Sequence, residues 1–111
     1  MTLHVQDAAQ LTRKAGQAAE LLTALANESR LAVLCELVDG ERSVSALAKT
    51  VGLTQSALSQ HLARLRAAGI VGTRREAQTI YYRLTSAPAV VVMQTLADIY
   101  CRRRRRRKSS H

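Results

Sequence analysis

Apolar residues recur with a helical period along most of the chain. From residue 7 to residue 25 they return every three or four positions, which predicts one long helix. Shorter helices are expected over 28–38, 44–51, 55–68 and 87–101. Each of these begins after a residue that can cap a helix, namely Asn27, Ser43, Thr54 and Ser86. The pattern therefore predicts a mainly helical chain.

One segment breaks the helical period. Residues 70–82 are rich in strand-forming side chains, interrupted by the polar stretch 75–78. This pattern predicts a β-hairpin that turns at 75–78. The expected order is α-α-α-α-β-β-α, with residues 1–101 as one domain. Residues 102–111 are expected to form a basic, disordered tail.

Charge is unevenly distributed along the 111 residues. The formal net charge is +9, and residues 102–108 supply seven positive charges. Residues 51–101 hold five arginines and two acids, a balance of +3, whereas residues 1–50 hold five basic and six acidic groups, a balance of −1. A local basic surface is typical of proteins that bind polyanions.

Neither a signal peptide nor a membrane-spanning apolar run is visible in the sequence. A cytoplasmic protein without membrane contact is therefore expected. Because that compartment is reducing, the two cysteines are not expected to form a permanent structural disulfide.

Residues 43–69 have the layout of a helix-turn-helix: a short helix, a turn at Gly52 and a longer helix. The exposed side of the longer helix has no acid and carries short polar side chains, which can approach base edges and phosphates. A basic hairpin directly after such a helix is typical of a wing. The residues expected to contact double-stranded DNA are Thr54, Gln55, Ser56, Ser59, Gln60, Arg64 and Arg66 on the helix, and Arg74, Arg75 and Gln78 on the wing. The alternative is a solvated polar helix with no ligand.

The stretches "LTALANESRLAVLCEL", "ALSQHLARLRAAGIV" and "RREAQTIYYRL" resemble the ArsR-type winged-helix repressors. The resemblance implies a winged helix-turn-helix fold and a homodimer that binds an inverted-repeat operator and is released by an inducer. The two recognition helices would lie about one DNA turn, roughly 34 Å, apart. It also implies that the first and last helices pair across the dimer, where Leu11, Ala18, Leu96 and Ile99 fit the interface.

Metal sensing is disfavoured, because ligands of the family's metal sites are missing. The helix before the recognition helix has no Cys-x-Cys motif, and the last helix has one acid and no histidine. His61, at the apolar edge of the recognition helix, is expected to be a hydrogen-bonded core residue. We expect neither a metal nor a cofactor.

Cys35 lies on an apolar stripe, which predicts that it is shielded, and taken alone it is a small buried hydrophobe. Together with Cys101 it resembles a dithiol subgroup of the family that responds to sulfide and persulfide. That resemblance implies a disulfide or polysulfide bridge between Cys35 and Cys101 that lowers DNA affinity. A sensor of peroxide or disulfide stress with the same fold is one alternative. An architectural DNA-binding protein that ignores sequence is another. A thiol enzyme is not expected, because the chain has no Cys-x-x-Cys pair.

Overall fold

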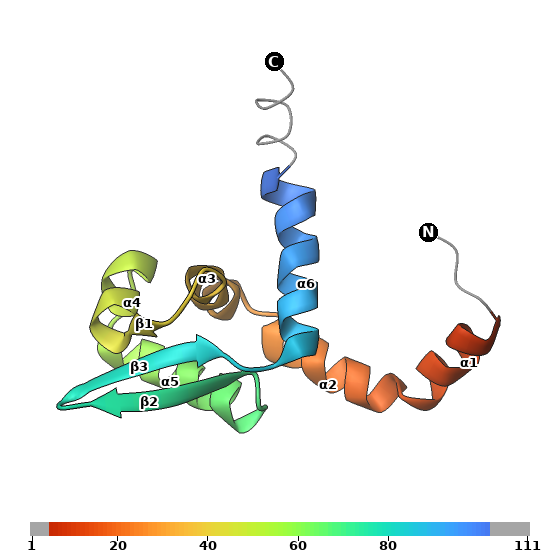
Figure 1. Ribbon diagram of the computed structural model, residues 1–111, viewed down its shortest axis with the longest axis horizontal. Coiled ribbons are helices and arrows are strands. Elements are labelled where there is room, and N and C mark those ends of the chain that lie inside the picture. Colours follow the sequence, from red (N-terminus) through yellow and green to blue (C-terminus); the bar gives the residue numbers. More distant parts are fainter. Residues whose placement is uncertain (1–4, 103–111) are drawn as a thin grey trace, which may run out of the picture.

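Helices dominate the computed structural model, which describes residues 5–102 (Figure 1). In chain order the elements are α1 (Val5–Arg13), α2 (Ala15–Leu25), α3 (Glu28–Leu37), β1 (Arg42–Ser43), α4 (Val44–Val51), α5 (Gln55–Ala67), β2 (Val71–Glu76), β3 (Thr79–Leu84), α6 (Ala87–Ala97) and a short π-helix, η1 (Asp98–Arg102). The expected fold, mainly helical with a wing, is confirmed. The tail expected at 102–111 lies outside the described residues, apart from its first position.

The helix starts agree with the expected caps. The backbone N–H three positions along the chain donates, over 3.0–3.1 Å, to the side-chain oxygen of Asn27, Ser43, Thr54 and Ser86. Each bond satisfies an N–H group that has no partner within its own helix. These capping bonds fix where α3, α4, α5 and α6 begin, so four of the helix starts are determined locally.

The long first helix predicted over 7–25 is wrong, because the chain breaks at Lys14 into α1 and α2. Lys14 has φ −104° and ψ 16°, outside the helical region, and its N–H is shared between the carbonyls of Gln10 and Leu11 at 3.1 Å each. All the described side chains of α1 are exposed. No core packing therefore holds α1 in line with α2, and the glycine two positions after the break weakens the helix further.

The wing is larger than the sequence indicated. β2 and β3 pair in an antiparallel register from Val71 opposite Leu84 to Glu76 opposite Thr79, so only two residues form the turn instead of the predicted four. The first of them, Ala77, has φ 56°, a region that non-glycine residues rarely adopt. The short strand β1, which the sequence did not reveal, pairs with β3 and gives the order β1-β3-β2.

One hydrophobic core joins the helices to the base of the wing. Its largest fully buried side chains are Val33, Leu34, Leu37, Leu47, Leu58, Leu62, Leu65 and Ile70. Figure 1 shows α3, α4 and α5 gathered beside the sheet, with α6 standing upright and α2 leading into α1 away from the body. No helix within residues 5–102 is both long enough and apolar enough to span a membrane.

Candidate nucleic-acid interface and thiol pocket

Helix α5 presents a polar face to solvent. Leu58, Leu62 and Leu65 are buried, and Ala57 and His61 are half-buried beside them. All seven residues that we expected to contact DNA from this helix are exposed: Thr54, Gln55, Ser56, Ser59, Gln60, Arg64 and Arg66. The helix contains no acidic residue. The structure thus leaves all the predicted helical contacts exposed, although Arg64 lies toward α2, where it lines a hollow together with Glu20.

Both ends of α5 are fixed by local geometry. At its start Thr54 accepts a hydrogen bond from the N–H of Ala57, over 3.1 Å. At its end Gly69 has φ +75°, and the N–H of Ile70 donates to the carbonyl of Leu65 over 2.9 Å. This is a Schellman arrangement, in which a left-handed glycine lets the chain leave the helix. The wing therefore starts at a defined angle from α5.

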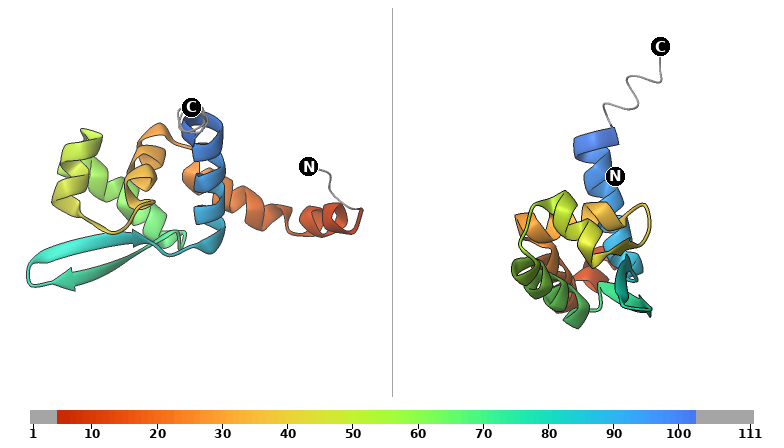
Figure 2. Two further views of the ribbon diagram at one scale, coloured as in Figure 1. Left: turned by 45° about the horizontal axis from the view of Figure 1, so that its top comes forward. Right: turned by 90° about the vertical axis from the view of Figure 1, so that its left-hand side faces the viewer.

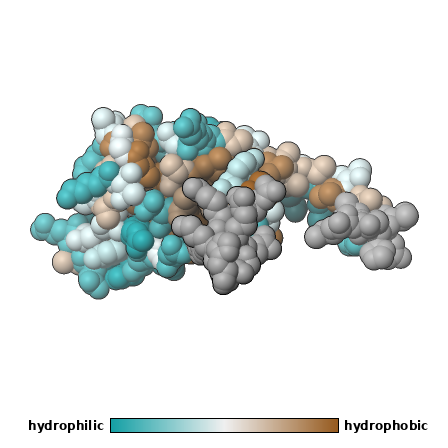
Figure 3. Space-filling model, turned by 90° about the horizontal axis from the view of Figure 1, so that it is seen from above, coloured by the Kyte–Doolittle hydropathy of each residue, from teal (hydrophilic) through white to brown (hydrophobic). Residues whose placement is uncertain are grey.

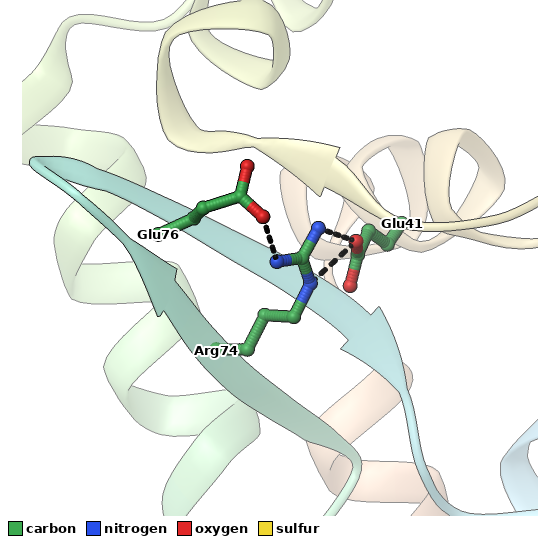
Figure 4. Close-up of polar contacts among 3 residues, drawn as sticks. All are labelled: Glu41, Arg74 and Glu76. Atoms are coloured by element: carbon green, nitrogen blue, oxygen red, sulfur yellow. Dashed lines mark hydrogen bonds and ion pairs between the residues drawn. The ribbon is translucent and has the colours of Figure 1, made fainter.

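Arg74, at the centre of the wing, is held by two carboxylates (Figure 4). Its Nε and Nη2 donate to Oε1 of Glu41 over 2.8 and 2.6 Å, and its Nη1 donates to Oε2 of Glu76 over 3.1 Å. The guanidinium also lies 4.5 Å from the ring centre of Tyr81, its cross-strand neighbour. These hydrogen bonds raise the pKa of Arg74 and lower that of Glu41. Arg74 thus fastens the wing to the loop after α3.

Arg75 and Gln78 differ from Arg74 in their surroundings. Both are exposed, at the outer end of β2 and in the turn. Within the part of the chain that the structure describes, neither has a hydrogen bond or ion pair through its side chain. Of the three wing residues predicted to contact DNA, these two are free to do so, whereas the charge of Arg74 is already balanced.

The two cysteines, 66 positions apart, line the same pocket. This pocket, the thiol pocket, has a volume of about 590 Å³ and lies between α3 on one side and α6 with η1 on the other. Its lining residues are Leu31, Cys35, Val38, Asp39, Met93, Leu96, Ala97, Tyr100 and Cys101. Both thiols are free and exposed. The fold therefore places the predicted sensing residues together within one subunit.

The expectation that Cys35 is shielded is wrong. Helix α3 buries Val33, Leu34 and Leu37 in the core, and its neighbouring stripe of Leu31, Cys35 and Val38 faces the open pocket. Partial burial nevertheless raises the pKa of the Cys35 thiol, and the nearby Cys101 and then Glu36 raise it further. The apolar stripe is thus the wall of a pocket rather than part of the core.

We expect alkylation of Cys35 by iodoacetamide to follow a pH profile whose midpoint lies above that of an unperturbed thiol. The reactive species is the thiolate, and a raised pKa means that less of it is present at neutral pH. Peptide-level mass spectrometry after timed alkylation measures the profile. In a Cys101→Ser protein the midpoint is expected to move to lower pH, because one source of negative charge is removed. An unchanged midpoint in that variant would contradict the proximity of the two thiols.

The residues predicted for a dimer interface do not form one cluster in the subunit. Leu11 and Ala18 line a hollow of about 540 Å³ between the α1–α2 arm and the body, while Leu96 lines the thiol pocket. Ile99 is 46 % exposed on η1. Two large apolar residues that the sequence analysis missed, Leu22 on α2 and Val91 on α6, are also exposed. The left view of Figure 2 shows α6 rising beside α2, with α1 farther out along the same arm.

Sequence reasoning also missed Arg30, the one charged side chain that is buried among the described residues. Its Nε donates to the carbonyl of Ala24 over 2.6 Å and its Nη2 donates to that of Thr23 over 3.2 Å. These carbonyls end α2, where a cation is favoured by the helix dipole. Burial, and then the charge of Arg64, lowers the pKa of Arg30. The residue fastens α2 to α3. Its helical position gave no signal of this role.

Possible metal ligands are scattered. Within residues 5–102, no group of three or more His, Cys, Asp or Glu side chains is arranged to hold a metal ion. His61, which we expected in the core, is half-buried on α5. His4 and His111 lie outside the described residues.

Comparison with known proteins agrees with this geometry. Residues 27–73 match the family described as "Bacterial regulatory protein, arsR family". The chain is 47 % identical over 92 residues to the transcriptional activator HlyU of Vibrio cholerae. These aligned residues cover 83 % of this chain and 85 % of that protein. A structure titled reduced HlyU superposes with a TM-score of 0.80, at 47 % identity, over 83 % of this chain and 97 % of that one.

Two further structures resemble the chain. The transcriptional repressor BigR of Xylella fastidiosa has a TM-score of 0.81 at 40 % identity, over 91 % of this chain and 98 % of that one. A DNA-binding domain from Mycobacterium bovis, described as a homodimeric winged helix-turn-helix, has a TM-score of 0.69 at 32 % identity, over 87 % and 86 % of the two chains. These relatives are transcription regulators and not enzymes. The chain belongs to the ArsR family of DNA-binding transcriptional regulators.

Proposed function

We propose that the protein is a homodimeric transcriptional repressor whose affinity for DNA falls when Cys35 and Cys101 are joined. The observation that supports this most directly is the presence of both thiols in one pocket, Cys35 on α3 and Cys101 on η1. The name of one relative, reduced HlyU, is in keeping with a thiol-dependent state. The inducer of this chain is a reactive sulfur species or another oxidant.

DNA is contacted by the exposed face of α5 and by the tip of the wing. The polar residues near the start of α5 suit base edges, because glutamine can pair with adenine through two hydrogen bonds. Arg64, Arg66 and Arg75 supply positive charge for phosphates. These contacts explain why the helix has no acidic residue, which would repel the phosphate backbone.

A second copy of the chain completes the DNA-binding unit. The apolar residues exposed on the α1–α2 arm and along α6 are the surface for this dimer, and the relative from Mycobacterium bovis is described as homodimeric. Leu11, Ala18, Leu96 and Ile99 remain our candidates. A two-fold dimer sets its recognition helices about one DNA turn, roughly 34 Å, apart over an inverted repeat.

Joining the thiols pulls α3 toward η1, and this shift also moves the wing. Asp39 lines the thiol pocket, and two residues later Glu41 holds Arg74 of the wing. A shift at the end of α3 therefore reaches both the dimer helix and the wing. A coupling of about 1–3 kcal/mol between the two sites corresponds to a change in DNA affinity of about 5- to 150-fold.

The proposal is tested with a fluorescent duplex that the reduced protein selects from a random-sequence pool. Anisotropy is measured before and after treatment with inorganic polysulfide, hydrogen peroxide or glutathione disulfide. We expect the treated protein to be released from the duplex. Its mass should change by the amount expected for a bridge between Cys35 and Cys101. An architectural DNA-binding protein would bind random and selected duplexes equally, in either redox state. A sensor that responds only to peroxide would be released from the duplex by hydrogen peroxide alone.

We expect Arg75→Ala to lower the salt dependence of DNA binding. Loss of one phosphate contact reduces the slope of log affinity against log salt by about 0.9 per subunit. The matched variant is Arg74→Ala at the adjacent position, which is expected to leave the slope nearly unchanged because its guanidinium is bound to Glu41 and Glu76. Anisotropy titrations at several salt concentrations measure both slopes. The reverse result would assign the phosphate contact to Arg74.

A further inference from the structure

The thiol pocket has a chemical character of its own, apart from its two sulfur atoms. Six of its nine lining residues are apolar: Leu31, Val38, Met93, Leu96, Ala97 and Tyr100. Its volume of about 590 Å³ is within the range of pockets that hold small organic molecules. Figure 3, which looks at the molecule from above, shows brown, apolar surface near the middle of this face. The space is larger than two sulfur atoms need in order to join.

The charge among the described residues that line this pocket is negative. Asp39 is the one charged residue among those that line it. Glu36, next to Cys35 in the sequence, lies close enough to raise the pKa of that thiol. No lysine or arginine contributes to the lining formed by the described residues. Among these described lining residues, an anionic reagent meets one carboxylate and mostly apolar side chains.

We propose that the thiol pocket receives an uncharged, apolar sulfur oxidant, of the class of organic trisulfides, in preference to an anionic one. This inference rests on the thiol switch proposed above. Burying the alkyl groups of such a molecule against α3 and α6 releases water from both surfaces. Burying a carboxylate there carries a large desolvation cost.

The reaction balances without a further reagent. One thiolate of the pair attacks a terminal sulfur of R–S–S–S–R, so that a protein–S–S–R bond forms and R–S–SH leaves once protonated. The second thiol then attacks the protein sulfur of that mixed disulfide and R–SH leaves. The sum is R–S–S–S–R plus two protein thiols, giving the Cys35–Cys101 disulfide, R–SH and R–S–SH. The two thiols are oxidised by two electrons, and the trisulfide is reduced by two.

The test compares two reagents with the same reacting group. Dipropyl trisulfide is uncharged and apolar, while glutathione trisulfide carries four carboxylates and two amines. The rate at which Cys35 and Cys101 join is measured by acid quench and mass spectrometry on the full chain. The ratio of the two rates is then divided by the ratio for the same chain unfolded in urea. We expect a preference of roughly tenfold for the dipropyl reagent, as burial of about two methylene groups gives.

A variant that fills the pocket should abolish this preference. Ala97 lines the pocket and is half-buried on α6, so Ala97→Phe reduces the space for the propyl groups. The matched control is Ala32→Phe, because Ala32 is exposed on α3 and does not line the pocket. It should keep the preference. If Ala97→Phe does not fold, Val38→Asn replaces an apolar lining residue, 40 % exposed, with an uncharged polar one and should also lower the preference.

Several results would overturn the inference. A normalised ratio near one, or a preference for glutathione trisulfide, would show that the pocket does not select apolar reagents. Rates that fall as protein concentration rises would show that a second copy covers the pocket. Failure of the proposed switch looks different: then neither reagent joins the thiols, or the joined protein binds the selected duplex as tightly as the reduced one.

Discussion

A Cys35→Ser protein is expected to bind the selected duplex as tightly as the reduced wild-type protein and to retain that affinity after polysulfide treatment. Serine is close to cysteine in size, and Cys35 is exposed, so the exchange removes reactivity with little change in packing. Without this sulfur the bond between α3 and η1 cannot form. The difference between wild type and variant after treatment should be about 5- to 150-fold in affinity, measured by anisotropy.

Two further variants make this expectation specific. Cys101→Ser should behave in the same way, because either sulfur alone cannot close the bridge. Ala32→Ser places a hydroxyl on the same helix at an exposed site outside the pocket, and it should respond like the wild type. Full release of the Cys35→Ser protein by polysulfide would refute the proposed pair. It would mean that Cys101 alone is sufficient for the response.

Replacing Arg30 with methionine is expected to lower the free energy of unfolding by about 3 kcal/mol, because two charge-assisted hydrogen bonds are lost from a buried site. Methionine retains much of the apolar volume of the side chain but cannot donate. The carbonyls of Thr23 and Ala24, in the last turn of α2, then lose the cation that binds them. For a domain of this size the melting temperature should fall by roughly 15 °C, measured by circular dichroism.

Arg66→Met is the control for this experiment. Arg66 is exposed on α5, and its loss should change the free energy of unfolding by less than about 0.5 kcal/mol. Arg30→Lys keeps the positive charge without the planar fork, and its stability should lie between those of Arg30→Met and the wild type. A methionine variant as stable as the wild-type protein would mean that the two bonds contribute no net stability.

Several features of this protein could be read from the sequence because they depend on residues close together in the chain. A cap acts on the N–H three positions ahead, so Asn27, Ser43, Thr54 and Ser86 specified the helix starts regardless of the rest of the fold. The two-sided character of α5 follows from the helical period alone. The candidate surface for DNA was therefore visible before any tertiary contact was known.

Where the sequence misled, packing between distant segments decided the outcome. The apolar period ran on through Lys14, but no core lies against α1 to hold one straight helix. The stripe that contains Cys35 faces an open pocket, because its neighbouring face on α3 fills the core. Periodicity identifies an apolar face, and only the path of the chain decides what that face meets.

The remaining parts of the site were decided by the tertiary structure alone. Arg74 is bound by a glutamate 33 positions away, and Cys35 shares a pocket with a residue 66 positions away. Arg30 is buried because the turn after α2 brings the end of that helix over its side chain. The sequence determined four helix starts, the presence of a hairpin and the polar face of α5, since local bonds and periodicity fix these. Tertiary structure decided which charges are paired and which thiols meet, since those depend on where separate elements come to lie.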